Sequence, residues 1–446
     1  MKEKERIVVT GMGAVTPVGI GTDEYWNGLV SGTCGIGRIS AFDASDLAVQ
    51  IAGEVHGFRA EDHMPMKLIH ETDAFTQYAF AAAREALEDA AECADGSTKG
   101  AADNADGSTE GAADNPDGST EIAGKYGELP AAADRCGIVM GTAMSGIDTI
   151  AATQEILTNA VHKNVGPRFV PRILGNIAAG QIAIRYGMTG PSFTISTACA
   201  SGGDAILMGA MQLLAGEADM MLAVGADSTL CPLVIYSLAN ARALSRENDH
   251  PERACRPFDT SAKGFVMGEG GGALVLETES GAKARGAKIY AVLAGWANNN
   301  DAYHVTAPTE DGARAAACMR RALEHARMEP EQIGYINAHG TGAVKGDLAE
   351  VRAMESVFEG CRPAISSTKA ATGHMMGGGG ITEAIACIKA IQTGTLPANL
   401  NLEQPIADLD FVTETRRDQQ IRAAMTNAFG FGGQNSTVIF KAADQE

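Results

Sequence analysis

The sequence predicts an α/β fold, because short apolar runs alternate with longer alanine-rich stretches along most of its 446 residues. The apolar runs are continuous rather than alternating with polar residues, which is typical of strands that helices cover on both faces. Hydrophobic residues make up 45% of the chain, enough for a large core, and its 53 glycines suit tight backbone packing. We therefore expect helices on both faces of largely parallel sheets.

The expected elements follow in chain order. The expected strands are 6–17, 136–146, 192–198, 219–228, 287–297, 333–342, 364–374 and 436–442. The expected helices are 73–92, 203–218, 312–328 and 381–394. The order runs twice, which predicts an internal duplication with halves 1–280 and 281–446. We expect a site where the two halves meet.

Residues 94–121 stand apart from this pattern. An eleven-residue unit rich in Ala, Asp, Gly and Ser is repeated twice and then broken off, with seven acidic residues and one lysine. The segment has no apolar periodicity, so we expect a solvated, mobile insertion. Its Asp and Asn spacing does not match a calcium-binding loop.

Charge and cysteine usage limit the classes of partner. The formal charge of −20 argues against nucleic acid or an anionic membrane surface as the main partner. No apolar run reaches the roughly 18–20 residues that a membrane helix needs, and the N-terminal residues do not form a signal peptide. The nine cysteines show no CxxC pair and no zinc spacing, so we expect buried thiols, no metal site and a cytoplasmic location.

Cys199 lies between a strand-like run and a Gly/Ala-rich helix, in the stretch STACASG. At a helix N-terminus, unpaired N–H groups would lower the pKa of the thiol and hold a developing oxyanion. A small packing residue would occupy the same position, because free cysteines are often buried. This stretch alone leaves both interpretations open.

Two histidines follow expected strands beside glycines, His339 in NAHGTG and His374 in SSTKAATGH. Loops at a sheet edge place catalytic groups, and a histidine there can donate a hydrogen bond or move a proton near pH 7. The alternative is a pair of strand-end histidines that bond to backbone. Lys369 lies in an otherwise uncharged stretch and needs a partner, for which Glu383 is a candidate.

Two further carboxylates, Asp347 and Glu350, are candidates to support His339, although isolated surface charges would explain them equally well. The stretch TNAFGFGGQNS (426–436) forms an expected glycine-rich loop before the final strand. Phe429 and Phe431 would cover a pocket mouth there, and an N–H of the loop would join an oxyanion hole. A turn with core phenylalanines is the alternative.

STACASG, NAHGTG, SSTKAATGH and NAFGFGGQNS, in this order, resemble the motifs of the β-ketoacyl synthases, condensing enzymes of the thiolase superfamily. The resemblance spans almost the whole chain except 94–130, with further matching stretches at 8–19, 256–277 and 301–308. It implies a thiolase-like duplicated α-β-α-β-α five-layer sandwich that forms a homodimer. It also implies decarboxylative Claisen condensation of an acyl thioester with malonyl-acyl carrier protein, without a redox cofactor or a metal.

The same resemblance implies a role for each motif residue. Cys199 holds the acyl chain, His339 and His374 stabilise the enolate, and Lys369 and Glu383 orient and polarise the histidines. The N–H groups of Cys199 and Phe431 form the oxyanion hole, and Phe431 gates the acyl site. Thr341 and Thr306 are implied to bind the phosphopantetheine arm of the carrier.

The chain departs from the family pattern in three places. Ala343 replaces a second hydroxyl residue after the first histidine, and Lys67 is the one basic residue kept before residue 73 in a stretch that is usually basic. Arg168, Arg172, Arg242 and Arg246 would supply a positive patch instead. The acidic insertion would repel an acidic carrier near the entrance.

Four hypotheses follow from the resemblance. The first is an elongating synthase of type II fatty-acid synthesis, and the second is the same chemistry in a polyketide or other specialised pathway. The third is a weakly active acyl-carrier-binding partner subunit, which the Cys/His/His set disfavours. The fourth is a thiolase that uses coenzyme A.

Overall fold

The computed structural model describes residues 5–92, 129–159 and 165–443. The acidic insertion predicted at 94–121 lies outside the described residues, so its mobility stays a prediction. Its neighbour on the N-terminal side is helix α3 (Ala74–Ala91), which begins where the Asp73 side chain accepts the N–H of Phe75.

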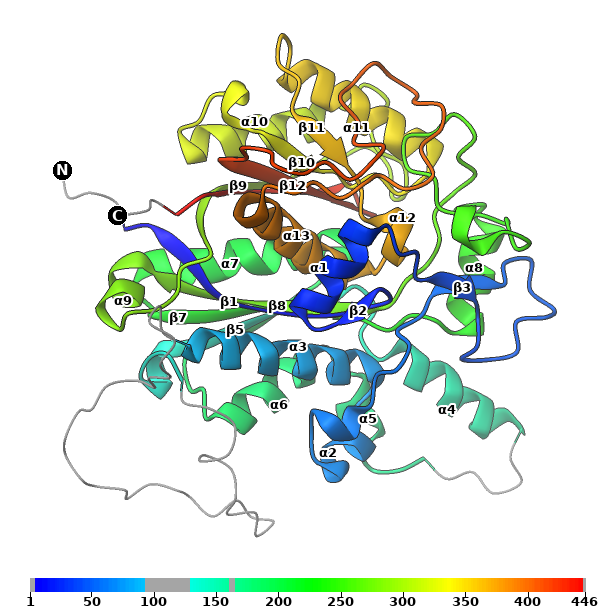
Figure 1. Ribbon diagram of the computed structural model, residues 1–446. Coiled ribbons are helices and arrows are strands. Elements are labelled where there is room, and N and C mark those ends of the chain that lie inside the picture. The colour runs from blue at the N-terminus through cyan, green and yellow to red at the C-terminus, as the bar shows by residue number, and fades with distance from the viewer. Residues whose placement is uncertain (1–4, 93–128, 160–164, 444–446) are drawn as a thin grey trace, which may run out of the picture.

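One continuous sheet runs through the described part of the molecule and repeats one strand order twice (Figure 1). The strands before residue 280 are β1 (Ile7–Thr16), β5 (Cys136–Gly141), β6 (Ser192–Ile195), β7 (Met220–Asp227) and β8 (Gly270–Thr278). Those after it are β9 (Ala291–Asn300), β10 (Tyr335–Asn337), β11 (Ala364–Ser366), β12 (Ala423–Gly430) and β13 (Gln434–Lys441).

The strand order is β6-β5-β7-β8-β1 in the first set and β11-β10-β12-β13-β9 in the second. When the strands of each set are numbered in chain order, both sets have the order third, second, fourth, fifth, first. The parallel and antiparallel pairs are also the same in both sets. A short antiparallel pairing of Ile7–Val9 with Leu293–Ala291 joins the two sets. The exact boundary at residues 280 and 281 stays a prediction.

The expectation of largely parallel sheets is wrong for half of each set. β5, β6 and β7 pair in parallel, as do β10, β11 and β12, whereas β1, β8, β9 and β13 pair antiparallel. Helices cover the antiparallel strands on both faces too, so continuous hydrophobic runs do not distinguish the two arrangements. Strands β8 and β12 were not among the expected strands.

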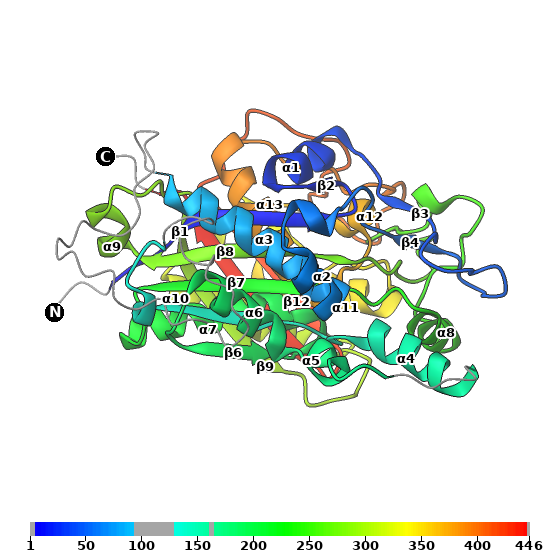
Figure 2. The same cartoon turned by 90° about the horizontal axis from the view of Figure 1, so that it is seen from below.

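The two sets of strands form two layers, and helices form three layers around them (Figures 1 and 2). Helices α7 (Ser201–Ala215) and α13 (Gly379–Thr393) form the central layer and contact strands of both sets. Helices α3 and α6 (Asn176–Tyr186) cover the outer face of the first set, and α10 (Ala313–Ala326) and α11 (Val344–Val357) cover that of the second. The result is the five-layer α-β-α-β-α sandwich that the sequence resemblance implies.

Further helices and strands complete the fold. The helices are α1 (Thr22–Ser31), α2 (Met66–Glu71), α4 (Ile147–Asn159), α5 (Phe169–Ile173), α8 (Pro232–Asn240), α9 (Glu279–Ala284) and α12 (Lys369–Thr372). The strands are β2 (Gly19–Ile20), β3 (Ile36–Arg38) and β4 (Ile51–Gly53).

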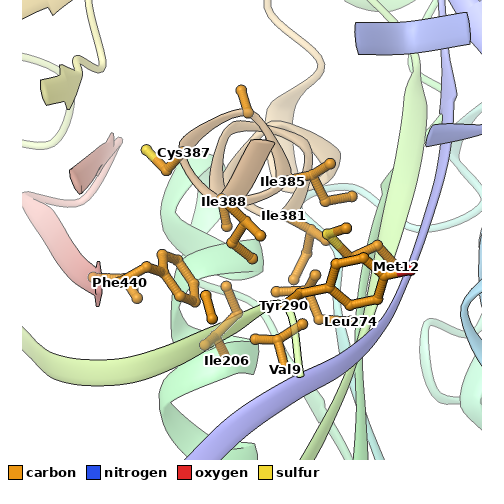
Figure 3. Close-up of a cluster of buried hydrophobic side chains, with 14 of the residues drawn as sticks. Val9, Met12, Ile206, Leu274, Tyr290, Ile381, Ile385, Cys387, Ile388 and Phe440 are labelled. Atoms are coloured by element: carbon orange, nitrogen blue, oxygen red, sulfur yellow. The ribbon is translucent and has the colours of Figure 1, made fainter. Parts of the chain in front are cut away.

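The central layer carries the main hydrophobic core (Figure 3). Ile381, Ile385 and Ile388 of α13 pack with Ile206 of α7 and Phe440 of β13, and all five are fully buried. Because both central helices are packed between strands, the loops that precede them are held at one edge of the sheet.

Glycines bring the starts of α7 and α13 into contact. A Cβ atom on Gly202 would lie 2.6 Å from the carbonyl oxygen of Gly377, and one on Gly380 would lie 2.6 Å from the nitrogen of Gly203. Side chains at these positions would force the two helices apart. The close approach lets Cys199, just before α7, meet His374, just before α13.

Replacing Gly380 by alanine is expected to destabilise the protein by about 1–3 kcal/mol, because the added methyl group overlaps the backbone of α7. Urea unfolding measures the change. Gly180 of α6 is a matched control, since a Cβ there has no neighbour within 4 Å. Gly180→Ala should leave stability unchanged or raise it by about 0.5–1 kcal/mol. Equal losses in both variants would contradict the proposed helix contact.

The stretch Ala198–Ala215 is long and apolar enough, by length and composition, to cross a membrane. The expectation that no run reaches this length is therefore wrong. In the structure 67% of the stretch is buried, and it forms the central helix α7 with its preceding turn. A core helix of this kind passes the same test, so the finding is weak evidence for a membrane span.

Candidate active site

Cys199 lies in a tight turn between β6 and α7. The turn covers Ala198–Ala200, and Ala198 has a left-handed backbone with φ of 52°. Ser201 stabilises it, because its Oγ accepts the N–H of Thr197 at 2.9 Å and donates to the carbonyl of Ala198 at 2.6 Å. The Cys199 side chain is buried, 6% exposed, and points to the residues before α13.

His374 is the direct neighbour of the thiol, with its Nε2 atom 3.0 Å from Cys199 Sγ. Its ring is buried and meets the edge of Phe265, with ring centroids 5.5 Å apart. Backbone bonds to Val266 and Gly268 fix the segment, at 2.7 and 2.9 Å. The structure thus brings together two side chains that are 175 residues apart in the sequence.

His339 follows β10 and lies beside His374, with the two rings nearly perpendicular and 5.4 Å apart. Phe429 covers it, with ring centroids 5.6 Å apart. The Glu350 carboxylate accepts the N–H groups of His339 and Gly340, both at 2.8 Å. Glu350 is fully buried, so it supports His339 through the backbone of the loop and is not a surface charge.

Asp347 acts on the next turn of the same loop. Its carboxylate accepts the N–H groups of Thr341 at 3.1 Å, of Gly342 at 3.1 Å and of Phe258 at 2.8 Å. Asp347 is buried, and burial raises its pKa to about 7. It therefore holds Thr341 rather than the ring of His339.

Lys369 and Glu383 form a buried ion pair, with side chains 2% and 3% exposed. The pair joins α12 to the first half of α13, and the Lys369 charge acts on both histidines. Burial raises the pKa of Glu383, and the Lys369 charge opposes that shift. The partner predicted for Lys369 is the partner observed.

Both histidine rings are neutral near pH 7. Burial, followed by the charge of Lys369, lowers the pKa of His374 to about 3. The same two causes, with His374, lower the pKa of His339 well below its usual value. The Nδ1 atoms of both rings are buried without a hydrogen-bond partner among the described residues. If the proton of each ring is on Nε2, the unpartnered Nδ1 atom carries a lone pair and no hydrogen. A buried acceptor without a partner costs less free energy than a buried N–H without one, so the Nε2–H tautomer is favoured.

The ring of His374 is expected to stay neutral from pH 8 down to pH 5, because its pKa lies near 3. Histidine NMR signals measured against pH check this, with the His374 signal assigned by its loss in His374→Asn. The same residue in the urea-unfolded chain should titrate near pH 6.5. A His374 signal that titrates between pH 6 and 7 in the folded protein would contradict the conclusion that burial and the Lys369 charge lower the pKa of this ring.

Cys199 differs from the expectation of a lowered pKa. Burial raises the pKa of its thiol to about 12, although Lys369 and the N–H of Phe431 act in the opposite direction. The expectation is wrong because Cys199 precedes α7 in a closed, apolar turn, where loss of hydration outweighs the N–H groups. Its sulfur still receives the backbone N–H groups of Phe431 and of Cys199 itself.

The segment around Phe431 is a β-hairpin rather than the loop that was expected. Phe429 and Gly430 end β12, and Phe431 lies in the turn before β13, 37% exposed. A Cβ atom on Gly430 would lie 2.5 Å from the carbonyl of Thr197 and 3.1 Å from the nitrogen of Cys199. Glycine therefore allows the hairpin to approach Cys199. Phe429 packs on His339, and its place at a pocket mouth stays a prediction.

The two predicted pantetheine-binding residues lie in different surroundings. Thr341 is buried, and its Oγ1 accepts the N–H of Ala343 at 3.2 Å. Thr306 is exposed, in a loop whose Val305 carbonyl accepts the N–H of Gly432 at 2.6 Å. Thr306 therefore lies beside the Phe431 turn and is not among the residues that contact Cys199.

Sequence reasoning missed two residues near the thiol. Asp227 ends β7, is fully buried, and acts on Cys199 through its charge. Phe265 packs on His374. An aspartate at the end of the apolar run LAVGADS was a visible signal for Asp227, because a charge there needs buried donors. Among the described residues, no group of three His, Cys, Asp or Glu side chains is placed to hold a metal ion.

The fold is a duplicated α/β sandwich, and its site combines a buried cysteine with two neutral histidines and two N–H donors. This combination is that of an acyl-transferring condensing enzyme of the thiolase class. Family models agree: residues 4–107 and 121–282 match the beta-ketoacyl synthase N-terminal domain, and 290–403 match its C-terminal domain. The chain belongs to the beta-ketoacyl synthase family.

Individual relatives match along almost the whole chain. The 3-oxoacyl-[acyl-carrier-protein] synthase 2 of Synechocystis sp. is 39% identical over 443 residues, covering 98% of each chain. A beta-ketoacyl synthase structure from Burkholderia phymatum is 30% identical with a TM-score of 0.84, covering 99% of this chain and 100% of that one. A type II polyketide ketosynthase solved with its acyl-carrier protein is 29% identical with a TM-score of 0.83, with the same coverage.

Proposed function

We propose that this chain catalyses decarboxylative Claisen condensation of an acyl thioester with malonyl-acyl carrier protein, as an elongating synthase of type II fatty-acid synthesis. The observation that carries the proposal is the contact of Cys199 Sγ with His374 Nε2 at 3.0 Å, with His339 beside it. This set offers a nucleophile and two neutral hydrogen-bond donors in one buried place. The relatives named as 3-oxoacyl-carrier synthases support the choice of substrate.

In the first half-reaction, Cys199 Sγ attacks the thioester carbonyl of the acyl-carrier. The C–S bond to the carrier breaks, and the thiol proton of Cys199 passes to the departing pantetheine sulfur. The oxyanion of the tetrahedral intermediate accepts the N–H groups of Cys199 and Phe431, which already point at the sulfur. The acyl chain then packs among the apolar residues around Cys199, including Met144, Leu230 and Met376.

In the second half-reaction, malonyl-carrier loses CO2 and its C–C bonding electrons form an enolate. Neutral His339 and His374 donate Nε2–H bonds to the enolate oxygen, so no added metal is required. The enolate carbon attacks the acyl-cysteine carbonyl, the C–S bond breaks, and the cysteine sulfur takes up a proton from solvent water. The product is 3-oxoacyl-carrier, two carbons longer than the acyl group that entered.

The rest of the site keeps these groups in place. Lys369 and Glu383 hold both rings neutral and oriented, and Glu350 and Asp347 hold the His339 loop. Thr341 and Thr306 bind the pantetheine arm, which enters past the Phe431 turn. We propose no cofactor, because the substrates carry their own phosphopantetheine.

Incubation of the chain with acyl-carrier and malonyl-carrier tests the proposal. It should release CO2 and form 3-oxoacyl-carrier, detected by mass spectrometry of the intact carrier. A mixture without acyl-carrier controls for decarboxylation alone. Absence of carbon–carbon bond formation with acyl groups of every length would overturn the proposal.

A polyketide or other specialised synthase is the second candidate, because a type II polyketide ketosynthase shares the fold at 29% identity. The 3-oxoacyl-carrier synthases are 36–39% identical and favour fatty-acid elongation. A single condensation per acyl group supports elongation, whereas repeated condensation without reduction between rounds supports a polyketide role.

The proposed partners are acyl carrier protein and a second copy of this chain. For the carrier, Arg172, Arg242 and Arg246 remain candidate contacts, whereas Arg168 pairs with Glu71. For the dimer, β6 lies at the edge of the sheet, where β5 is its one partner among the described strands, and Phe193 is 43% exposed. Light scattering of the purified chain distinguishes a dimer from a monomer. We propose a cytoplasmic location, in line with free thiols at the eight described cysteines.

A further inference from the structure

Asp227 is a buried carboxylate that the reaction scheme does not use. It is the last residue of β7, and its side chain is fully buried. Its Oδ2 atom accepts the N–H groups of Ala143 and Gly377, both at 2.8 Å. Its Oδ1 atom accepts the hydroxyl of Thr142 at 2.8 Å and the N–H of Met144 at 3.1 Å.

The four donors belong to two segments that come from different halves of the chain. Residues 142–144 follow β5, which is the parallel neighbour of β7, so both strands end at the same edge. Gly377 lies three residues after His374, in the turn before α13. A Cβ atom on Gly377 would lie 2.6 Å from Asp227 Oδ2, so glycine permits this approach. Asp227 is therefore a bridge between the two segments.

Both segments border the thiol. Met144 and Met376 belong to the apolar cluster that contains Cys199. Methionine side chains are flexible and adapt to irregular space. An acyl chain on Cys199 can therefore enter this cluster by moving methionine side chains while the backbone beneath them stays fixed.

We propose that Asp227 is a positioning residue that sets acyl-chain-length selectivity, by fixing the backbone of residues 142–144 and of Gly377 near Cys199. This inference rests on the proposed condensation. Asp227 touches neither the substrate nor the reacting atoms, and its effect on chain length is exerted through Met144 and Met376.

The carboxylate is required because of the number of donors. An ionised carboxylate offers about four lone-pair sites, and four donors occupy them here. Asparagine offers one acceptor oxygen and places an NH2 group where the second oxygen was. At least one backbone N–H therefore loses its acceptor, either that of Met144 or those of Ala143 and Gly377, and the segment that carries it is held less firmly. Burial raises the pKa of Asp227 to about 6, although the four hydrogen-bond donors act in the opposite direction.

The test compares Asp227→Asn with a matched control, Glu277→Gln. Glu277 is a buried carboxylate at the opposite end of the same strand pair, where it pairs with Met220 and bonds Thr10 and Arg285. Condensation rates with acyl-carriers of 4 to about 16 carbons, and the melting temperature, are measured for each variant and for the unaltered chain.

Asp227→Asn is expected to raise the ratio of long-chain to short-chain kcat/KM on the order of tenfold, because a less firmly held segment lets the space beside Cys199 widen. Glu277→Gln is expected to lower the melting temperature and to leave this ratio unchanged. Thr142→Val removes one donor and keeps the charge, so it should shift the ratio in the same direction by less. If Asp227→Asn does not fold, the proposal is tested by Thr142→Val instead. A higher ratio of long-chain to short-chain kcat/KM then supports it, and an unchanged ratio overturns it.

An unchanged ratio in Asp227→Asn, or an equal change in Glu277→Gln, would overturn the proposal. A second measurement separates this failure from failure of the proposed function. Alkylation of Cys199 by iodoacetamide and by N-dodecyl iodoacetamide, quantified on the Cys199 peptide, reports the same selectivity without any condensation. The rate of Cys199 alkylation by the dodecyl reagent, divided by the rate with iodoacetamide, should be higher in Asp227→Asn than in the unaltered chain.

Discussion

Replacing Cys199 by alanine is expected to lower the condensation rate on the order of 10³-fold or more, because no thioester can then form between the acyl group and the protein. Mass spectrometry should find no acylated protein after incubation with acyl-carrier. The two histidines and the Phe431 hairpin remain in place, so release of CO2 from malonyl-carrier should continue at a measurable rate. Loss of acylation together with retained CO2 release would separate the two half-reactions.

Cys318→Ala is the matched control for that variant. Cys318 is also a fully buried free thiol, but it lies in the outer helix α10 and bonds the carbonyl of Ala297 at 3.3 Å. Its loss should cost stability and leave most of the condensation rate. Undiminished condensation in Cys199→Ala would contradict the assignment of the nucleophile.

Breaking the buried pair of Lys369 and Glu383 is expected to have the second largest effect. Glu383→Ala leaves the lysine charge buried without its partner, which should destabilise the fold by about 3–5 kcal/mol. The double variant Lys369→Met/Glu383→Leu removes both charges and keeps apolar volume, so it should recover most of that stability. Urea unfolding measures both changes.

The double variant should fold and still condense poorly at low pH. Lys369 lowers the pKa of both His339 and His374, so its removal raises both pKa values. The rings then protonate at a higher pH, and the acid limb of the rate profile should move to higher pH. An acid limb that does not move would show that Lys369 has no electrostatic role.

A surface pair serves as the control. Arg362 and Asp408 are bonded at 2.8 Å, but their side chains are 57% and 93% exposed. Asp408→Ala should leave both the stability and the pH profile almost unchanged, because solvent screens an exposed pair.

The fold was predictable as far as each strand or helix carries its own pattern. The runs at 6–17 and 219–228 became β1 and β7, and the stretches at 73–92 and 381–394 became α3 and α13. Strand direction was not predictable, because antiparallel strands covered on both faces have the same continuous hydrophobic runs as parallel ones. Strands β8 and β12 were missed because glycines and polar residues interrupt their patterns.

The residues of the candidate site could be identified from the sequence alone. Cys199, His339, His374, Lys369 and Glu383 could be chosen from short stretches, because a nucleophile, neutral donors and a buried charge each require particular residue types. The motif order and a resemblance to the β-ketoacyl synthases added the reaction. The structure brings all five of these residues to one place.

Distances, charge states and supporting contacts were decided by the tertiary structure alone. The pKa of Cys199 is raised rather than lowered, Glu350 and Asp347 hold backbone rather than a ring, and Asp227 joins two segments that no local pattern connects. The physical reason is that burial and long-range contacts set these properties, and both arise only when α7 and α13 bring the two halves of the chain together.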